Sequence, residues 1–165
     1  MKDDRKKADA LWGKLIHLFF QLCAVGSTRG VPCPVANPSL SPCSLPDDAI
    51  SAVDRGVICS CSGVVQAHHL ITRAHGSLRH APENGIGLCR HHHQECREMS
   101  PHMGPDGFQA WLEIYRPDQA EWLRSHKNQI QRPDYQAACL HLSDMLACVN
   151  NGFGPVWKNG ELYLE

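Results

Sequence analysis

One histidine pair and one histidine triplet lie in the middle of this 165-residue chain, which has eleven histidines and nine cysteines. His68 and His69 end a short β-prone stretch, and a triplet of histidines follows a second such stretch. A neutral imidazole can bind a divalent ion or take a proton from water near pH 7. Because neighbouring residues of a strand point to opposite faces, His68 and His69 cannot both bind one metal from a regular strand. We therefore expect one to bind metal and the other to meet substrate, a division that suits phosphodiester hydrolysis.

Short elements must position these side chains. Residues 64–71 and 85–88 predict two strands, and residues 89–99 predict a helix that carries His93, the last histidine of the triplet. The expected order is strand, loop, strand, helix. Such a helix can complete a metal site opposite the first strand.

These residues resemble the signature of the HNH or ββα-metal (His-Me finger) endonucleases. The signature has a His or Asp followed by His, then an Asn, then a closing His on the helix, and His68-His69, Asn84 and His93 match it. The resemblance implies that His69 is the general base of DNA hydrolysis. It also implies that His68 and His93 bind a catalytic divalent ion (Mg²⁺, Mn²⁺ or Zn²⁺) and that Asn84 fixes the loop holding the base. An Asn side chain can join two backbone segments in this way.

A closer resemblance is to phage NinG-like and related prophage HNH proteins, and it covers residues 55–127. It implies an α+β protein whose small ββα-metal core has zinc-stabilised knuckles and is flanked by N- and C-terminal helices. The implied setting is the cytoplasm of a bacterial host, and the implied partner is double-stranded or branched DNA. The matching residues are His69, Thr72-Arg73, Arg79, Pro82, Asn84, Leu88-Cys89 and the segment Phe108-Gln109-Ala110-Trp111-Leu112.

Many HNH proteins brace this fold with a structural zinc ion held by two Cys-x-x-Cys knuckles. The second knuckle resembles Cys89-x-x-His92, but the first, Cys59-Ser60-Cys61, has a single residue between its thiols. The resemblance implies Cys59, Cys61, Cys89 and His92 as the tetrahedral zinc set. Replacement of one of these ligands stays open, with Cys33, Cys43 and Cys96 as the alternatives. The apolar helical patterns around Cys23, Cys139 and Cys148 predict core thiols.

The formal net charge of −1 means that any affinity for nucleic acid must come from a local basic patch. Arg73, Arg79 and Arg90 lie around the histidines and are predicted to contact phosphate, with solvated surface arginines as the competing interpretation. No base-reading helix is recognisable, which predicts low sequence specificity. Four further histidines are predicted to lie in loops or on the surface: His75, His80, His91 and His102.

The chain divides into a core and three flanking parts. Residues 1–25 contain an apolar stripe that predicts an amphipathic helix over residues 9–23. Lys14 and His17 interrupt its apolar run, which excludes a signal peptide, and no stretch reaches transmembrane length, so no membrane partner is expected. The remaining predictions are a Pro-rich insertion at 26–54 with a short helix at 47–53, a nuclease core at 55–127 with helices at 108–115 and 117–127, and a tail at 128–165 with a helix at 135–148 and an Asn-Gly hairpin at 156–163.

Two other functions fit parts of the pattern. One is a zinc-stabilised nucleic-acid-binding module that has lost catalysis and assists recombination. The other is a small metal sensor in which the histidine cluster binds the sensed ion. A complete catalytic set disfavours the first, and the second would need a single dominant Cys/His site without the nuclease spacing. A homodimer of the protein is left open.

Overall fold

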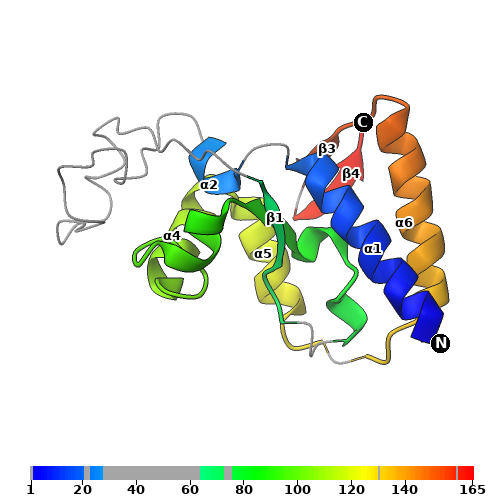
Figure 1. The fold of residues 1–165 in the computed structure, drawn as a ribbon, viewed down its shortest axis with the longest axis horizontal. Helices are drawn as coiled ribbons and strands as arrows, with labels where there is room; N and C mark the ends of the chain where they lie inside the picture. Colours follow the sequence, from blue (N-terminus) through cyan, green and yellow to red (C-terminus); the bar gives the residue numbers. More distant parts are fainter. Residues whose placement is uncertain (1, 21–22, 28–63, 73–75, 130, 159) are drawn as a thin grey trace. The chain divides into compact units, whose positions relative to one another are not determined.

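The computed structural model describes residues 2–20, 23–27, 64–72, 76–129, 131–158 and 160–165 (Figure 1). Helices and two small sheets make up these residues, so the predicted α+β class is confirmed. The chain forms two compact units, which we call unit 1 (residues 1–19, 67–86 and 117–165) and unit 2 (residues 20–66 and 87–116). No helix among the described residues is long and apolar enough to cross a membrane.

Two long helices of unit 1, α1 (Lys2–Phe19) and α6 (Tyr135–Asn150), pack against each other (Figure 1). Near their N-terminal ends the Cys139 thiol of α6 donates a hydrogen bond to the carbonyl oxygen of Asp4 of α1 over 3.4 Å. The predicted helix over residues 9–23 was wrong in its bounds, since α1 begins seven residues earlier and ends at Phe19. Acidic residues in its first turn favour the early start. The buried side chains are Ala8, Trp12, Leu15 and Ile16 on α1 and Cys139, Leu142, Met145 and Leu146 on α6.

The strands β1 (Gln66–His69) and β2 (Gly85–Leu88) form one two-stranded sheet, and the chain passes between the units within each strand. β2 has the predicted bounds, whereas β1 is shorter than the predicted 64–71. One reason is local, because the backbone N–H and C=O of Ile71 bond to the side chain of Asn84. Two 3-10 turns lie between the strands, η2 (Gly76–Leu78) and η3 (Pro82–Asn84).

The C-terminal third completes unit 1. Helix α5 (Pro117–His126) contacts an antiparallel hairpin of β3 (Pro155–Lys158) and β4 (Glu161–Leu164), which confirms the predicted helix and hairpin. Gly160 follows β3 with a φ of 77°, a conformation that glycine adopts without strain. A small apolar cluster joins these elements to the loop between β1 and β2, through Ile71, Leu78, Trp122, Ala81, Leu123 and Trp157.

Unit 2 contains α2 (Ala24–Ser27), a single π-helical turn η4 (His91–Glu95) and α4 (Pro105–Tyr115). The predicted helix over residues 89–99 was wrong in extent. The amide of Cys96 donates to the carbonyl oxygen of His91 over 2.9 Å, which widens the turn, and further turns follow it. Close backbone approach after the turn needs glycine, because a Cβ at Gly107 would lie 1.9 Å from the carbonyl oxygen of Glu98.

Several predictions fall outside the described residues. They concern most of the Pro-rich insertion, the short helix at 47–53, the zinc-ligand candidates Cys33, Cys43, Cys59 and Cys61, and the residues Arg73 and His75.

Candidate functional site

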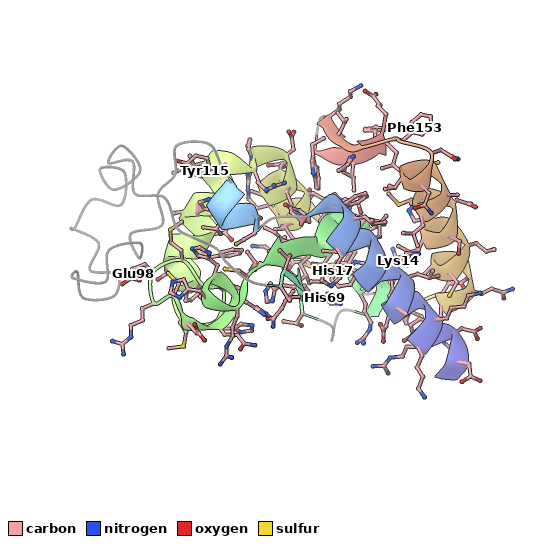
Figure 2. All side chains as sticks on the ribbon, turned by 45° about the horizontal axis from the view of Figure 1, so that its top comes forward. Lys14, His17, His69, Glu98, Tyr115 and Phe153 are labelled. Carbon is pink, nitrogen blue, oxygen red and sulfur yellow. The ribbon has the colours of Figure 1, made fainter. Side chains whose placement is uncertain are left out.

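The histidine pair lies on β1, where both residues are half-buried. The imidazole of His69, labelled in Figure 2, meets the indole of Trp12 edge-on, and the ring centroids are 3.8 Å apart. Trp12 is itself fixed, because its Nε1–H donates to the carbonyl oxygen of Ala81 over 3.0 Å. The indole ring of Trp12 on α1 therefore restricts the rotamers of His69.

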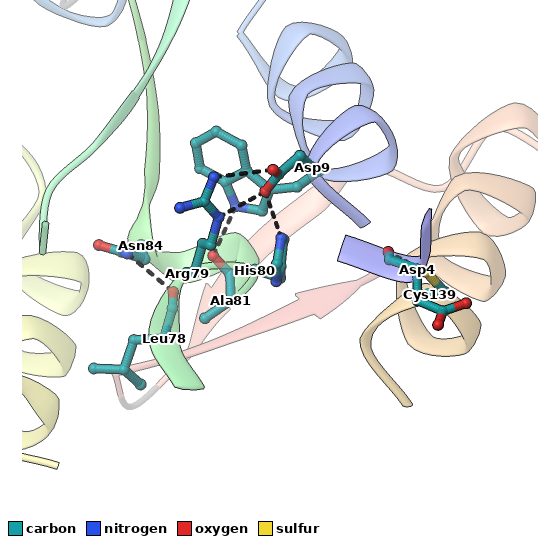
Figure 3. Close-up of polar contacts among 9 residues, drawn as sticks. Asp4, Asp9, Leu78, Arg79, His80, Ala81, Asn84 and Cys139 are labelled. Carbon is teal, nitrogen blue, oxygen red and sulfur yellow. Dashed lines mark hydrogen bonds and ion pairs between the residues drawn. The ribbon is translucent and has the colours of Figure 1, made fainter. Parts of the chain in front are cut away.

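Asn84 is fully buried and its amide joins two segments of the loop between β1 and β2. Its Oδ1 accepts from the backbone N–H of Ile71 over 2.5 Å, and its Nδ2 donates to the carbonyl oxygens of Ile71 and Leu78 at 3.0 Å each (Figure 3 shows the bond to Leu78). The amide of Leu70 also bonds to the backbone oxygen of Asn84 over 2.9 Å. The chain directly after His69 is thus held by one side chain.

Two more side chains hold the same loop, and neither was predicted from the sequence to be important for the site. Gln119 of α5 is buried, and its Nε2 donates to the backbone oxygens of Glu83 and Gly85 at 2.8 and 2.9 Å. Trp12 holds the carbonyl of Ala81 from α1. A polar residue on the inner face of an amphipathic helix was the available signal for Gln119, since buried amides need partners.

Arg79 has a different environment from the one predicted. Its side chain is 9% exposed, and its Nε and Nη2 bond to the two carboxylate oxygens of Asp9 at 2.7 and 2.9 Å (Figure 3). Burial raises the pKa of Asp9, but hydrogen bonds from Arg79 and His80 outweigh it and lower the pKa to about 2. The predicted phosphate contact of Arg79 is therefore replaced by an internal ion pair, since a bidentate carboxylate satisfies the guanidinium fork.

His80 lies in the loop between β1 and β2, as one of the two predicted settings had it, but its side chain is buried and does not lie on the surface. Its Nε2 lies 2.7 Å from Oδ1 of Asp9, and its ring meets Tyr135 edge-on at 5.7 Å. Burial lowers the pKa of His80, against the opposing effect of the Asp9 carboxylate. Asp9, Arg79 and His80 form a polar cluster that joins α1 to the loop.

His93 lies in the π-helical turn η4 of unit 2. Its Nδ1 is 2.6 Å from Oε1 of Gln66, so Nδ1 carries the proton and the lone pair is on Nε2. The ring of the exposed His102 lies 5.1 Å away, and Ser100 Oγ donates to the His93 carbonyl over 2.7 Å. Burial, and then the charge of His102, lowers the pKa of His93. His68 belongs to unit 1, so a shared ion between His68 and His93 stays a prediction.

Three side chains of unit 2 form a group that could hold a metal ion. Two of them, Cys89 and His92, are members of the predicted zinc set. The third member is Cys23, which the sequence analysis treated only as a core thiol. Nδ1 of His92 lies 3.3 Å from Sγ of Cys23 and 3.3 Å from Sγ of Cys89. Cys59 and Cys61 lie outside the described residues, so their part in this site stays a prediction.

His91, His92 and Cys96 form another group whose potential ligand atoms lie within 4.8 Å of one another. His91 Nε2 is buried and has no hydrogen-bond partner in the described part of the chain. Cys96 was one of the alternative zinc ligands. Both groups could hold a metal ion such as zinc, with thiolate and imidazole ligands of the kind zinc prefers.

The remaining arginine of the predicted basic patch is exposed. Arg90 has 77% of its side chain accessible and pairs with Glu95 over 2.8 Å. An exposed ion pair of this kind exchanges readily with solvent or an anion. Phosphate contact by Arg90 therefore stays a prediction.

Comparison of the chain with family models, curated proteins and solved structures gives no match. The residues described above are the basis for assigning a function.

Proposed function

We propose that this protein is a metal-dependent HNH-type endonuclease that hydrolyses phosphodiester bonds of DNA. The observation that carries the proposal is the buried amide of Asn84, which bonds to both backbone groups of Ile71, two residues after His69. A general base must be held in one orientation to act on a bound water. Asn84 supplies such a hold at the loop, and Trp12 supplies it at the imidazole ring.

In this proposal His69 takes the proton of the attacking water, while His68 and His93 bind the catalytic ion. When bound, a divalent ion supplies charge stabilisation to the phosphate. The hydrogen bond to Gln66 fits His93 for this role, since a metal-binding imidazole usually donates its other N–H to an oxygen acceptor. Asn84 is a positioning residue.

DNA contacts in this proposal are made mainly to the sugar-phosphate backbone. Arg90 is exposed and close in sequence to His93, and Arg73 follows His69 by four residues. Arginine contacts to phosphate position a protein on a duplex but carry no sequence information. We therefore expect low sequence specificity and leave Arg79 out of the binding set.

The test is cleavage of supercoiled and branched DNA by the wild type and His69→Ala, in Mg²⁺, Mn²⁺ or chelator. General-base catalysis contributes about 10²- to 10⁴-fold, so His69→Ala should lose at least about a hundredfold in nicking rate. His141→Ala is the matched control, because His141 is an exposed histidine of α6 in the same unit. It should cleave like the wild type.

Folding of both variants must be equal to the wild type by circular dichroism and zinc content before rates are compared. Chelator should stop cleavage by the wild type. If the wild type binds DNA but never cleaves it under any metal, the nuclease proposal is wrong and the non-catalytic binding module takes its place. Cleavage by His69→Ala at the wild-type rate would remove His69 as the base.

A further inference from the structure

We infer that Cys23, Cys89 and His92 bind one zinc ion in unit 2. The three side chains come from separate positions, since Cys23 precedes α2 and the other two belong to the turn that follows β2. Their ligand atoms lie within 4.8 Å of one another, and the exposed fractions of the residues are 3%, 3% and 0%. Cys23 is the new ligand.

The distances fit tetrahedral zinc. With Zn–S near 2.3 Å and Zn–N near 2.0 to 2.1 Å, the sulfur-to-nitrogen edge of a tetrahedron is about 3.5 Å. The two observed separations from Nδ1 of His92 are both 3.3 Å. A small expansion would admit the ion between the three atoms.

Hydrogen bonding alone explains this group poorly. A neutral imidazole nitrogen has either one N–H or one lone pair, so His92 Nδ1 can form one good hydrogen bond there. Two thiols nevertheless lie at the same distance from it. A cation resolves the conflict, because both thiols lose their protons and the lone pair of Nδ1 points to the ion.

The ligand types select the metal. Two thiolates and one imidazole form a soft set that favours zinc over magnesium or calcium. The neighbouring group of His91, His92 and Cys96 shares His92 but offers a single thiol. Zinc should therefore bind to the group with Cys23 and Cys89 in preference to the group with His91 and Cys96.

Zinc at this position would brace the turn that carries His93. The amide N–H of His93 donates to the carbonyl oxygen of Cys89 over 2.8 Å. A backbone hydrogen bond therefore connects His93 directly to one of the proposed zinc ligands. Cys23 would connect this turn to the segment before α2. The inference stands apart from the proposed nuclease activity, since metal binding is measured without DNA.

The first experiment loads the full-length protein with Co²⁺ in place of Zn²⁺ and measures thiolate-to-cobalt charge-transfer absorption. Cys23→Ser should lose the intensity of one thiolate and weaken zinc binding, measured by competition with a chromophoric chelator, by at least about a hundredfold. That is at or above the upper end of the usual cost of losing an outer-shell partner, about 10- to 100-fold. Cys139→Ser is the control, because Cys139 is a buried cysteine of α6 in unit 1. Its spectrum and affinity should match the wild type.

A second experiment needs no substitution. The wild type, with and without zinc, is treated with an alkylating reagent, and the modified cysteines are identified by peptide mass spectrometry. Zinc should protect Cys23 and Cys89 at least about tenfold, while Cys139 should label at the same rate in both samples. Equal labelling of Cys23 with and without zinc, or an unchanged cobalt spectrum in Cys23→Ser, would overturn the inference.

Discussion

Replacement of Asn84 by alanine should destabilise the protein by about 3 to 5 kcal/mol. The wild-type side chain makes three hydrogen bonds to buried backbone groups, one to an N–H and two to carbonyl oxygens. Each such bond contributes about 1 kcal/mol net, and a buried group left without a partner adds its own desolvation cost. Against a typical free energy of unfolding of about 5 to 15 kcal/mol, this is a large fraction of the total stability.

Urea unfolding followed by circular dichroism measures the change, with Asn150→Ala as the control. Asn150 is exposed at the end of α6, so its variant should stay within about 0.5 kcal/mol of the wild type. Amide hydrogen exchange gives a local measurement, because the N–H of Ile71 bonds to Oδ1 of Asn84. Its protection should fall more than that of the α6 amides. If Asn84→Ala unfolds at the wild-type urea concentration, the amide does not hold the loop.

The aspartate variant separates the effect of side-chain volume from that of the two donated bonds. In Asn84→Asp, carboxylate oxygens would face the carbonyl oxygens of Ile71 and Leu78, which accept from Nδ2 in the wild type. Burial and this repulsion favour the protonated acid, so its folded pKa is raised above the unfolded value near 3.9. The unfolded state then holds fewer protons, and stability falls as the pH rises above about 4. Parallel pH profiles for Asn84→Asp and the wild type would contradict the orientation of the amide.

Three further results are expected. Asp9→Asn leaves the buried guanidinium of Arg79 without its carboxylate and should cost about 2 kcal/mol by urea unfolding, less than a fully buried pair because Asp9 is 35% exposed. In the wild type the folded pKa of Asp9 is about 2, so its contribution is complete above pH of about 4 and is lost towards pH 2, which acid titration of the wild type against Asp9→Asn checks. Gly85→Ala should lower the free energy of unfolding by about 1 to 3 kcal/mol, since its Cβ would lie 2.2 Å from a buried side-chain carbon. Gly13→Ala on α1, where a Cβ would meet nothing within 4 Å, should raise the free energy of unfolding by up to about 1 kcal/mol. Equal effects of the two variants in urea unfolding would contradict the packing around Gly85. Zinc removal by chelator should speed amide exchange at His93 and leave the α6 amides unchanged, and the opposite order would contradict the placement of the metal in unit 2.

Elements with strong local signals were predictable from the sequence. β2, α5, α6 and the C-terminal hairpin follow from apolar periodicity and turn residues, which act over a few neighbouring positions. The π-helical form of η4 was not predictable, because a widened turn competes closely with an α-helical one. Contacts with residues far away in the sequence decide which of the two forms η4 adopts.

The environment of single side chains depended on partners far away in the chain. Arg79 was predicted to contact phosphate and His80 to lie in a loop or on the surface. Their carboxylate partner, Asp9, lies on α1 about 70 residues earlier in the chain. Cys23 meets His92 across 69 residues, after a helix that ends at Phe19 instead of continuing to residue 23. Hydrophobic periodicity cannot identify such pairs, since it reports which face is buried and not what lies opposite.

The loop between β1 and β2 shows what the flanking helices contribute to the proposed site. Asn84 holds the loop from within, Trp12 bonds to it from α1, and Gln119 bonds to it from α5. Each of these three contacts ends on a backbone carbonyl oxygen, so helices and loop are joined through the main chain of the loop. A catalytic residue needs this kind of support, because a small displacement of a general base costs much of its rate. In the proposed nuclease, α1 before the HNH-like segment and α5 within it therefore help to position His69, and a fragment limited to residues 55–127 should lose the contact to Trp12 and most of its activity.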